Sequence, residues 1–210
     1  MEAMSNDHPN SVAKTWGNRH DYLPAAGHDL LLPVYDLLTR VLGMPPAYDM
    51  LVAQAQLFAG ARVLDIGCGT GNLTIRARRA ESAVQITGID PDPPRALEKA
   101  RKKAPDVTFE RGYAQELPFV DGSFDRVLSS MMLHHLDPEM RRAALGEAYR
   151  VLRPGGSVHI VDVVGRHLSV AHADGELPGL LREAGFDCAD LGSGGCAWWV
   201  RSPSFGGTRA

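Results

Sequence analysis

The chain has 210 residues, which suits one domain with a full hydrophobic core. Hydrophobic residues make up 44% and charged residues 22%, as is usual for a soluble globular protein. The net charge of -3 gives no electrostatic reason to expect a nucleic acid as partner. No apolar run approaches the roughly 20 residues that a membrane-spanning helix requires. We therefore expect no membrane span.

The N-terminus and the cysteines indicate the compartment. Residues 1–9 are polar and lack the apolar core of a signal peptide, so we expect a cytoplasmic location. Cys68, Cys188 and Cys196 are odd in number and widely spaced, which is not typical of a disulfide framework or a zinc site. Reduced thiols and no bound metal are the simplest interpretation.

The N-terminal segment is predicted to form a helical cap. Residues 1–26 carry no regular pattern, whereas leucines and valines recur at helical spacing across Gly27–Gly43. Pro45-Pro46 is expected to interrupt this helix. A second helix is predicted from Ala47 to Phe58. We assign residues 1–58 to the cap.

Beyond the cap, short apolar segments alternate with amphipathic ones. The predicted strands are Arg62–Ile66, Val84–Ile89, Val107–Glu110, Phe124–Ser129 and Val158–Val163, with two more near Cys188–Leu191 and Ala197–Arg201. The predicted helices are Leu73–Ala80, Arg95–Lys103, Glu139–Leu152 and Leu177–Ala184. Pro154-Gly155-Gly156 is expected to stop the third of these helices. Residues 59–203 thus form the main domain, and residues 204–210 are expected to be a tail.

This alternation predicts an α/β fold. Repeated strand–helix units give a Rossmann-like three-layer sandwich, with a mostly parallel seven-stranded sheet and helices on both faces. Such sheets bind ligands beyond the carboxyl ends of their strands. The loops that should carry the chemistry are Gly67–Asn72, Asp90–Pro94, Tyr113–Phe119 and Ser130–His135.

A glycine-rich turn follows the first predicted strand. Gly67, Gly69 and Gly71 allow the backbone to turn sharply and to approach a ligand closely, although a plain tight turn would use the same residues. A dinucleotide fingerprint would place its third glycine one residue later. Asp65, just before the turn, would repel a pyrophosphate. It would suit a ligand with an ammonium and a sulfonium group, and S-adenosyl-L-methionine has both.

Asp90 ends the second predicted strand, 19 residues after Gly71. A carboxylate at this point can accept hydrogen bonds from two ribose hydroxyl groups. The alternative is an aspartate that starts a turn before Pro91. The glycine-rich turn favours the ribose interpretation.

At these residues the chain resembles the class I S-adenosylmethionine-dependent methyltransferases, and more narrowly the small-molecule group that includes the quinone-biosynthesis C-methyltransferases. The resemblance covers about Tyr35–Gly185. It is carried by the segments Val63–Gly71, Gly88–Asp90, Glu116–Phe119 with Gly122–Asp125, Leu133–Leu136 and Val151–Gly156.

The resemblance implies where the cofactor binds. Asp65, Gly67 and Gly69 would line its methionine part, and Asp90 would hold the ribose. The turn from Tyr113 to Gln115 would meet the adenine, to which Ala114 would offer its backbone N–H. Family members often carry Asp at the position of Tyr113, which could instead stack on the base or donate a hydrogen bond. The predicted cofactor-binding residues are Asp65, Gly67, Cys68, Gly69, Asp90, Pro91, Tyr113, Ala114, Gln115 and Ser130.

The acceptor side is less defined by the sequence. Methyl transfer is a direct displacement in which the enzyme aligns the two reactants, and a general base is needed only if the acceptor must lose a proton. His134 and His135 are the candidate bases, or alternatively support the turn. Met131 and Met132 are expected in the core or in an adaptable pocket wall. We expect a rather open site whose specificity comes from residues 1–50 and the loop after Ser130.

Three functions remain open at this point. The first is a methyltransferase for a small-molecule acceptor, as a monomer or homodimer. The second is a methyltransferase acting on RNA or protein, for which the only basic cluster is expected to be a solvated helix face formed by Arg141, Arg142, Arg150 and Arg153. The third is a cofactor-binding subunit without catalysis, against which the intact glycine-rich turn argues.

Overall fold

The computed structural model describes residues 44–91, 95–162, 176–196 and 200–209. The predicted helix Gly27–Gly43 and the segment before it lie outside these residues, so the N-terminal cap is described only from Met44 onward. Within the described residues, no helix is long and apolar enough to cross a bilayer.

A mostly parallel sheet forms the middle layer. Its strands follow the order β3-β2-β1-β4-β5-β7-β6. The strands are β1 (Arg62–Ile66), β2 (Gln85–Asp90), β3 (Thr108–Arg111), β4 (Phe124–Ser130), β5 (Leu152–Val161), β6 (Phe186–Cys196) and β7 (Val200–Arg209). Strands β1 to β5 are the five that pair in parallel, whereas β7 runs antiparallel to both β5 and β6.

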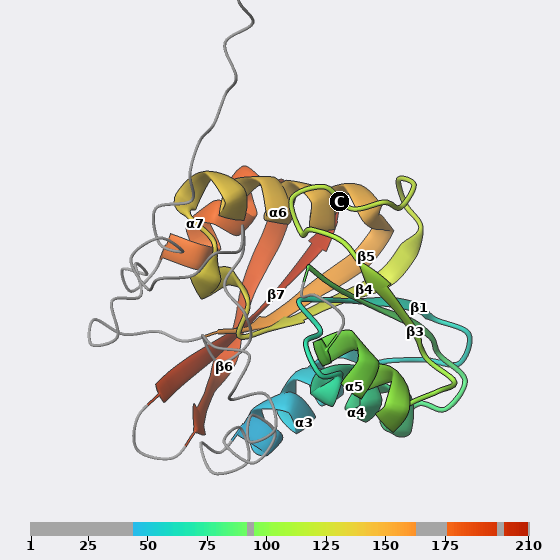
Figure 1. The fold of residues 1–210 in the computed structure, drawn as a ribbon. Coiled ribbons are helices and arrows are strands. Elements are labelled where there is room, and N and C mark those ends of the chain that lie inside the picture. Colours follow the sequence, from blue (N-terminus) through green and yellow to red (C-terminus); the bar gives the residue numbers. More distant parts are fainter. Residues whose placement is uncertain (1–43, 92–94, 163–175, 197–199, 210) are drawn as a thin grey trace, which may run out of the picture.

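Helices cover both faces of the sheet, as predicted. They are α3 (Met44–Ala55), α4 (Asn72–Ala80), α5 (Arg95–Lys103), α6 (Pro138–Val151) and α7 (Glu176–Glu183), with a short 3-10 helix η2 (Leu133–His135) before α6. Figure 1 shows α3, α4 and α5 on one face and α6 and α7 on the other. This arrangement is the three-layer, Rossmann-like sandwich expected from the alternation of strands and helices.

Two predicted boundaries are wrong near proline. The second predicted helix starts at Met44 and not at Ala47, with Pro45 and Pro46 in the first turn of α3, where a proline gives up no intrahelical hydrogen bond. The helix also ends at Ala55, before the predicted Phe58, and Gln56 then takes a left-handed backbone with φ of 46°. At the other boundary, β5 begins at Leu152 and passes through Pro154-Gly155-Gly156, which had been expected only to stop the helix.

The predicted C-terminal tail is also wrong. Residues 204–208 pair with residues 157–161 of β5, so they belong to β7. The backbone groups along the free edge of β5 obtain their partners from this strand, which the scattered glycines of the segment had concealed. Residues 197–199, and with them Trp198 and Trp199, lie outside the described part of the chain.

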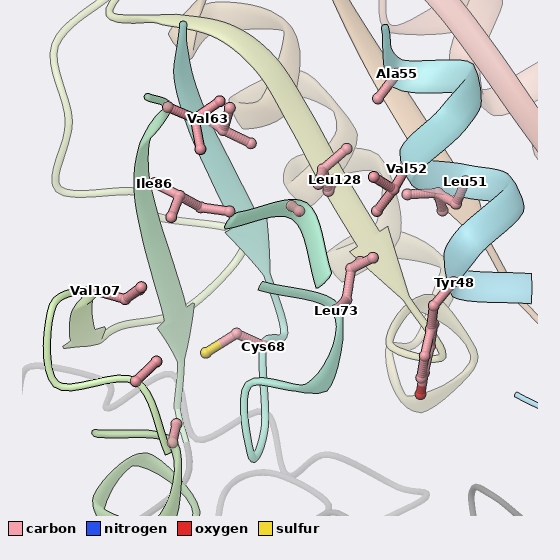
Figure 2. Packing of buried hydrophobic residues seen from close by; sticks show 14 of the residues in the cluster. Tyr48, Leu51, Val52, Ala55, Val63, Cys68, Leu73, Ile86, Val107 and Leu128 are labelled. Carbon is pink, nitrogen blue, oxygen red and sulfur yellow. The ribbon is translucent and has the colours of Figure 1, made fainter. Parts of the chain in front are cut away.

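The apolar core is divided between the two faces. Val63 and Leu64, neighbours on β1, are both fully buried, Val63 in the cluster under α3, α4 and α5 and Leu64 in the cluster under α6 and α7. Figure 2 shows the first cluster, in which Val52 and Ala55 of α3 point toward the strands. Because both faces of β1 are covered, the next residue, Asp65, is buried as well.

Candidate active site

A cavity with about 990 Å³ of empty space, counted to its open mouth, is lined by residues at and beyond the carboxyl ends of β1, β2 and β4. This is where parallel sheets bind ligands. Every predicted cofactor-binding residue except Asp65 lines it, namely Gly67, Cys68, Gly69, Asp90, Pro91, Tyr113, Ala114, Gln115 and Ser130. The structure thus brings together four loops that are far apart in the sequence.

The glycine-rich turn is rigidly placed. The backbone N–H groups of Gly67 and Cys68 both donate to the Ile89 carbonyl of β2, at 2.8 and 3.1 Å. Gly67 has φ of 73°, and a Cβ atom added there would lie 2.4 Å from Cγ of Met132. Both the left-handed backbone and the close approach require glycine at this position.

Asp65 lies beneath this turn and is fully buried. Its Oδ2 accepts a hydrogen bond of 2.5 Å from Oγ1 of Thr74, while Oδ1 has no hydrogen-bond partner among the described residues. Burial raises the pKa of this carboxyl group to about 7. An unsatisfied, buried carboxylate oxygen is costly, and a nearby cation would compensate it. The free acceptor oxygen of Asp65 therefore fits a ligand with an ammonium group.

Asp90 links the turn to the second strand. Its Oδ2 accepts a hydrogen bond of 2.8 Å from the backbone N–H of Gly69. The negative charge of Asp90 also contributes to the raised pKa of Asp65. The glycine-rich turn thus holds Asp90 at the cavity wall. The charge of Asp90 and the protonation of Asp65 are therefore coupled.

The segment from Tyr113 to Gln115 forms another wall of the cavity. The backbone N–H of Glu116 donates to the Tyr113 carbonyl at 3.2 Å, and the N–H of Gly112 donates to the Asp90 carbonyl at 3.2 Å. These two bonds close a turn and connect it to the end of β2. The predicted adenine and ribose segments are therefore neighbours in the fold.

The two histidines of η2 occupy different environments. His135 lines the cavity, whereas His134 is not among the lining residues and contacts Asp162 instead. The Nδ1 atom of His134 lies 2.5 Å from Oδ1 of Asp162, and its backbone N–H donates to Oδ2 at 3.1 Å. Burial, reinforced by His134, lowers the pKa of His135 to about 3. His135 is therefore a neutral imidazole at neutral pH.

Further residues at the cavity were not identified from the sequence. Tyr48 of α3, Leu136 and Met140 all line it. Tyr48 belongs to the buried helical stripe of α3, but its distance in sequence from the motifs hid its position. Asp162, the partner of His134, lies inside the predicted strand Val158–Val163, but β5 ends at Val161, so Asp162 is the first residue after this parallel strand.

Met131 and Met132 line the cavity, as the pocket-wall interpretation expects. Met131 has a left-handed backbone with φ of 55°, and its N–H donates to the Val161 carbonyl at 2.8 Å. A left-handed methionine costs roughly 1–2 kcal/mol, so the surrounding strands must hold this conformation.

The predicted solvated face of four arginines is wrong for Arg141 and Arg150, whereas the side chains of Arg142 and Arg153 are 56% and 51% exposed. Arg141 is only 2% exposed, and its Nε donates to the Leu133 carbonyl at 3.0 Å. Arg150 binds the loop after β3, and Arg153 belongs to β5 and pairs with Asp125. Arg142 pairs with Glu183 of α7, and both side chains are mostly exposed. Carbonyl and carboxylate partners that the spacing could not reveal hold the other three side chains.

Cys68 is buried in the turn. Burial and the charges of Asp90 and Asp65 raise the pKa of its thiol. The group is therefore protonated at neutral pH, as suits a small packing residue rather than a nucleophile. Among the described residues, no group of three or more histidine, cysteine or acidic side chains could hold a metal ion.

Comparison with known proteins agrees with this geometry. The profile of the methyltransferase domain family matches residues 63–156. An uncharacterised methyltransferase of Synechocystis sp. is 33% identical over 158 residues, which are 73% of this chain and 68% of that protein. The chain therefore belongs to the class I methyltransferases, whose methyl donor is S-adenosylmethionine.

Relatives with named acceptors are matched over shorter regions. A 27-O-demethylrifamycin SV methyltransferase of Amycolatopsis mediterranei is 43% identical over 54% of this chain and 43% of its own length. A demethylmenaquinone methyltransferase of Beutenbergia cavernae is 38% identical over 61% of this chain and 52% of its own length. The chain thus spans about half the length of these two relatives.

A solved structure shows the same fold. The 1,6-didemethyltoxoflavin-N1-methyltransferase of Burkholderia thailandensis, crystallised with S-adenosylhomocysteine, has a TM-score of 0.72. It covers all of this chain and 93% of its own, at 21% sequence identity. S-adenosylmethionine is the cofactor of this family, and the residues around the cavity fit it.

Proposed function

We propose that this enzyme transfers the methyl group of S-adenosylmethionine to a small-molecule acceptor by direct displacement. One observation carries the proposal: nearly all the predicted cofactor-binding residues line one cavity, together with Tyr48, Leu136 and Met140. Bound cofactor supplies an activated methyl group. The protein would then align the acceptor with that methyl group and exclude water from the site.

Each part of the cofactor has a proposed partner. Asp65 would stabilise the ammonium group from beneath the turn, through the carboxylate oxygen that lacks a protein partner. Asp90 would accept from the ribose hydroxyls, and Ala114 would donate its N–H to the adenine. Tyr113 stands where relatives often carry Asp, so here it would stack on the base or donate a hydrogen bond.

The acceptor would bind near Tyr48, Met132 and His135, which with Leu136 and Met140 give this region apolar walls and one imidazole. No charged side chain from η2 or the start of α6 lines the cavity. This composition supports a small acceptor with little charge, in agreement with the names of the two relatives with known acceptors. Residues 1–50 and the loop after Ser130 remain the proposed determinants of specificity.

His135 is the predicted base that lines the cavity, and its environment favours a role in orienting the acceptor. Its low pKa makes the neutral imidazole a hydrogen-bond acceptor throughout the neutral range, which suits orientation of an acceptor hydroxyl group. His134 would act through η2, because its bonds to Asp162 fix the turn that carries His135. Orientation by His135, rather than strong proton abstraction, is the role that its environment favours.

Transfer of labelled methyl groups tests the proposal. Purified protein with methyl-labelled S-adenosylmethionine is incubated separately with a metabolite pool, total RNA and cell protein. We expect label in the small-molecule fraction and its loss in the Asp90→Ala variant, because the ribose contact is removed. Label confined to RNA or protein would establish a macromolecular acceptor instead. Cofactor binding without label in any fraction would favour the non-catalytic subunit.

A further inference from the structure

The loop between β3 and β4 is held by two side chains of α6. Glu147 and Arg150 are three residues apart on this helix, and Nε and Nη2 of Arg150 donate to the two carboxylate oxygens of Glu147 at 2.7 and 2.8 Å. This is a bidentate pair, the geometry in which Arg and a carboxylate interact most strongly. Side chains 20% and 30% exposed place the pair mostly out of solvent.

Both members of the pair also bind the main chain of the loop. Oε2 of Glu147 accepts from the backbone N–H of Leu117 at 2.7 Å. Arg150 donates to the Leu117 carbonyl at 3.0 Å and to the Phe119 carbonyl at 2.7 Å. It also reaches Oδ1 of Asp121 at 2.8 Å. Charge-assisted hydrogen bonds from one helix thus hold the main chain of this loop.

The held segment is directly connected to the cavity wall. Only Glu116 separates Gln115, which lines the cavity, from Leu117, whose N–H and carbonyl are both bound by the pair. Leu117 is itself 4% exposed, so its side chain packs into the core while its main chain is held. A shift of Leu117 would therefore move the Tyr113–Gln115 turn.

The pair is charged throughout the neutral pH range. Hydrogen bonds from Arg150 hold the pKa of Glu147 below its usual value, and the same bonds raise the pKa of Arg150. A lysine has a single ammonium group and cannot reproduce the fork of donors that reaches a carboxylate and two carbonyls at once.

We infer that Glu147 and Arg150 are positioning residues for the cofactor: they hold the turn from Tyr113 to Gln115 where it recognises the adenine ring. Neither side chain lines the cavity, so both act through the loop main chain. The inference rests on the proposed placement of the adenine against this turn. It gives a role to a helix whose arginines had been interpreted as a solvated face.

Arg150→Lys and Glu147→Ala test this inference, with Arg142→Lys as the matched control. Arg142 lies on the same helix in an exposed ion pair with Glu183. The first measurement is the affinity for S-adenosylhomocysteine and for S-inosylhomocysteine, which lacks the adenine amino group. We expect both variants to bind S-adenosylhomocysteine at least tenfold more weakly and to lose most of the preference for adenine. The control should match the wild type.

Amide hydrogen exchange of the cofactor-free protein is the second measurement. Faster exchange in residues 113–121, with unchanged exchange in residues 67–71, is expected for both variants, because the loop loses its anchors while the glycine-rich turn keeps its own. A merely structural role would accelerate exchange throughout the domain and leave the adenine preference intact.

The outcomes separate this inference from the proposed function. A wild-type protein that binds both ligands equally well would overturn the placement of adenine against this turn, and with it the inference. Normal adenine preference in Arg150→Lys and Glu147→Ala, with the wild type discriminating, would overturn the inference alone. No binding by a folded wild-type protein would overturn the proposed cofactor site.

Discussion

Gly67 is where the backbone of the glycine-rich turn meets the wall formed by Met132. A left-handed backbone and a 2.4 Å approach to Cγ, near the root of the methionine side chain, leave no room for a Cβ atom. Gly69 also has a positive φ, of 51°, but a Cβ there would meet nothing within 4 Å. A side chain at Gly69 would meet backbone strain alone, whereas a side chain at Gly67 would meet backbone strain and a steric clash.

Gly67→Ala and Gly69→Ala therefore form a matched pair. We expect Gly69→Ala to cost about 1–2 kcal/mol of unfolding free energy, from the left-handed backbone alone. Gly67→Ala should cost about 1–3 kcal/mol more, because the neighbouring side chain must also move. Urea unfolding measures both. Equal losses would contradict the contact with Met132.

Asp65 is the second residue whose environment makes a specific prediction. Burial raises the pKa of its carboxyl group from the ordinary value of about 3.8 to about 7, so between these pH values the folded state holds a proton that the unfolded state has released. The stability from this group is complete below pH 4 and is lost as pH rises through 7. Asp65→Asn removes this dependence, because its amide does not titrate in this range.

From pH 5 to pH 8, the melting temperature of the wild type should therefore fall relative to that of Asp65→Asn. Calorimetry in two buffers of different ionisation enthalpy adds a second measure. Cofactor binding at pH 6 should release close to one proton from the wild-type protein, because the ammonium group favours the carboxylate. Binding at pH 8.5 should release little. A pH-independent difference in melting temperature would contradict the buried, protonated carboxyl group.

At the scale of elements, hydrophobic periodicity predicted most of the fold. The bounds of β1 and α5 agree with prediction, because a continuous apolar run and a strong amphipathic stripe define them locally. The errors lie where proline and glycine were interpreted as breaks, at the start of α3 and within β5 and β7. At these places the structure is decided by contacts with distant parts of the chain, such as the pairing of β7 with β5.

The candidate site divides in the same way. The glycine-rich turn and Asp90 could be predicted, because each chemical role follows a strand end within one short segment. Tyr48 could not, because the packing of α3 brings it to the cavity, and Glu147 could not, because it acts through the main chain of a distant loop. Asp162 was missed because the predicted strand extended past it to Val163.

At the scale of the whole molecule, the fold keeps the two halves of the reaction on different elements. The turns after β1, β2 and β3 would hold the methyl donor, while α3, η2 and the start of α6 would supply walls for the acceptor. α6 contributes to both, since its first turns follow η2 and its last turns hold the loop beside the cavity. The family match spans residues 63–156, which contain the predicted donor site.

Calorimetric titration with S-adenosylhomocysteine tests the central claim, that this cavity binds the methyl donor, most directly. Asp106→Ala is the control, because Asp106 is an exposed carboxylate paired with Arg78, away from the cavity. We predict one site per chain in the wild type and in the control. Asp90→Ala should bind about 10- to 100-fold more weakly, from the loss of charge-assisted hydrogen bonds. Equal affinity in Asp90→Ala, or no binding by the folded wild-type protein, would contradict the claim.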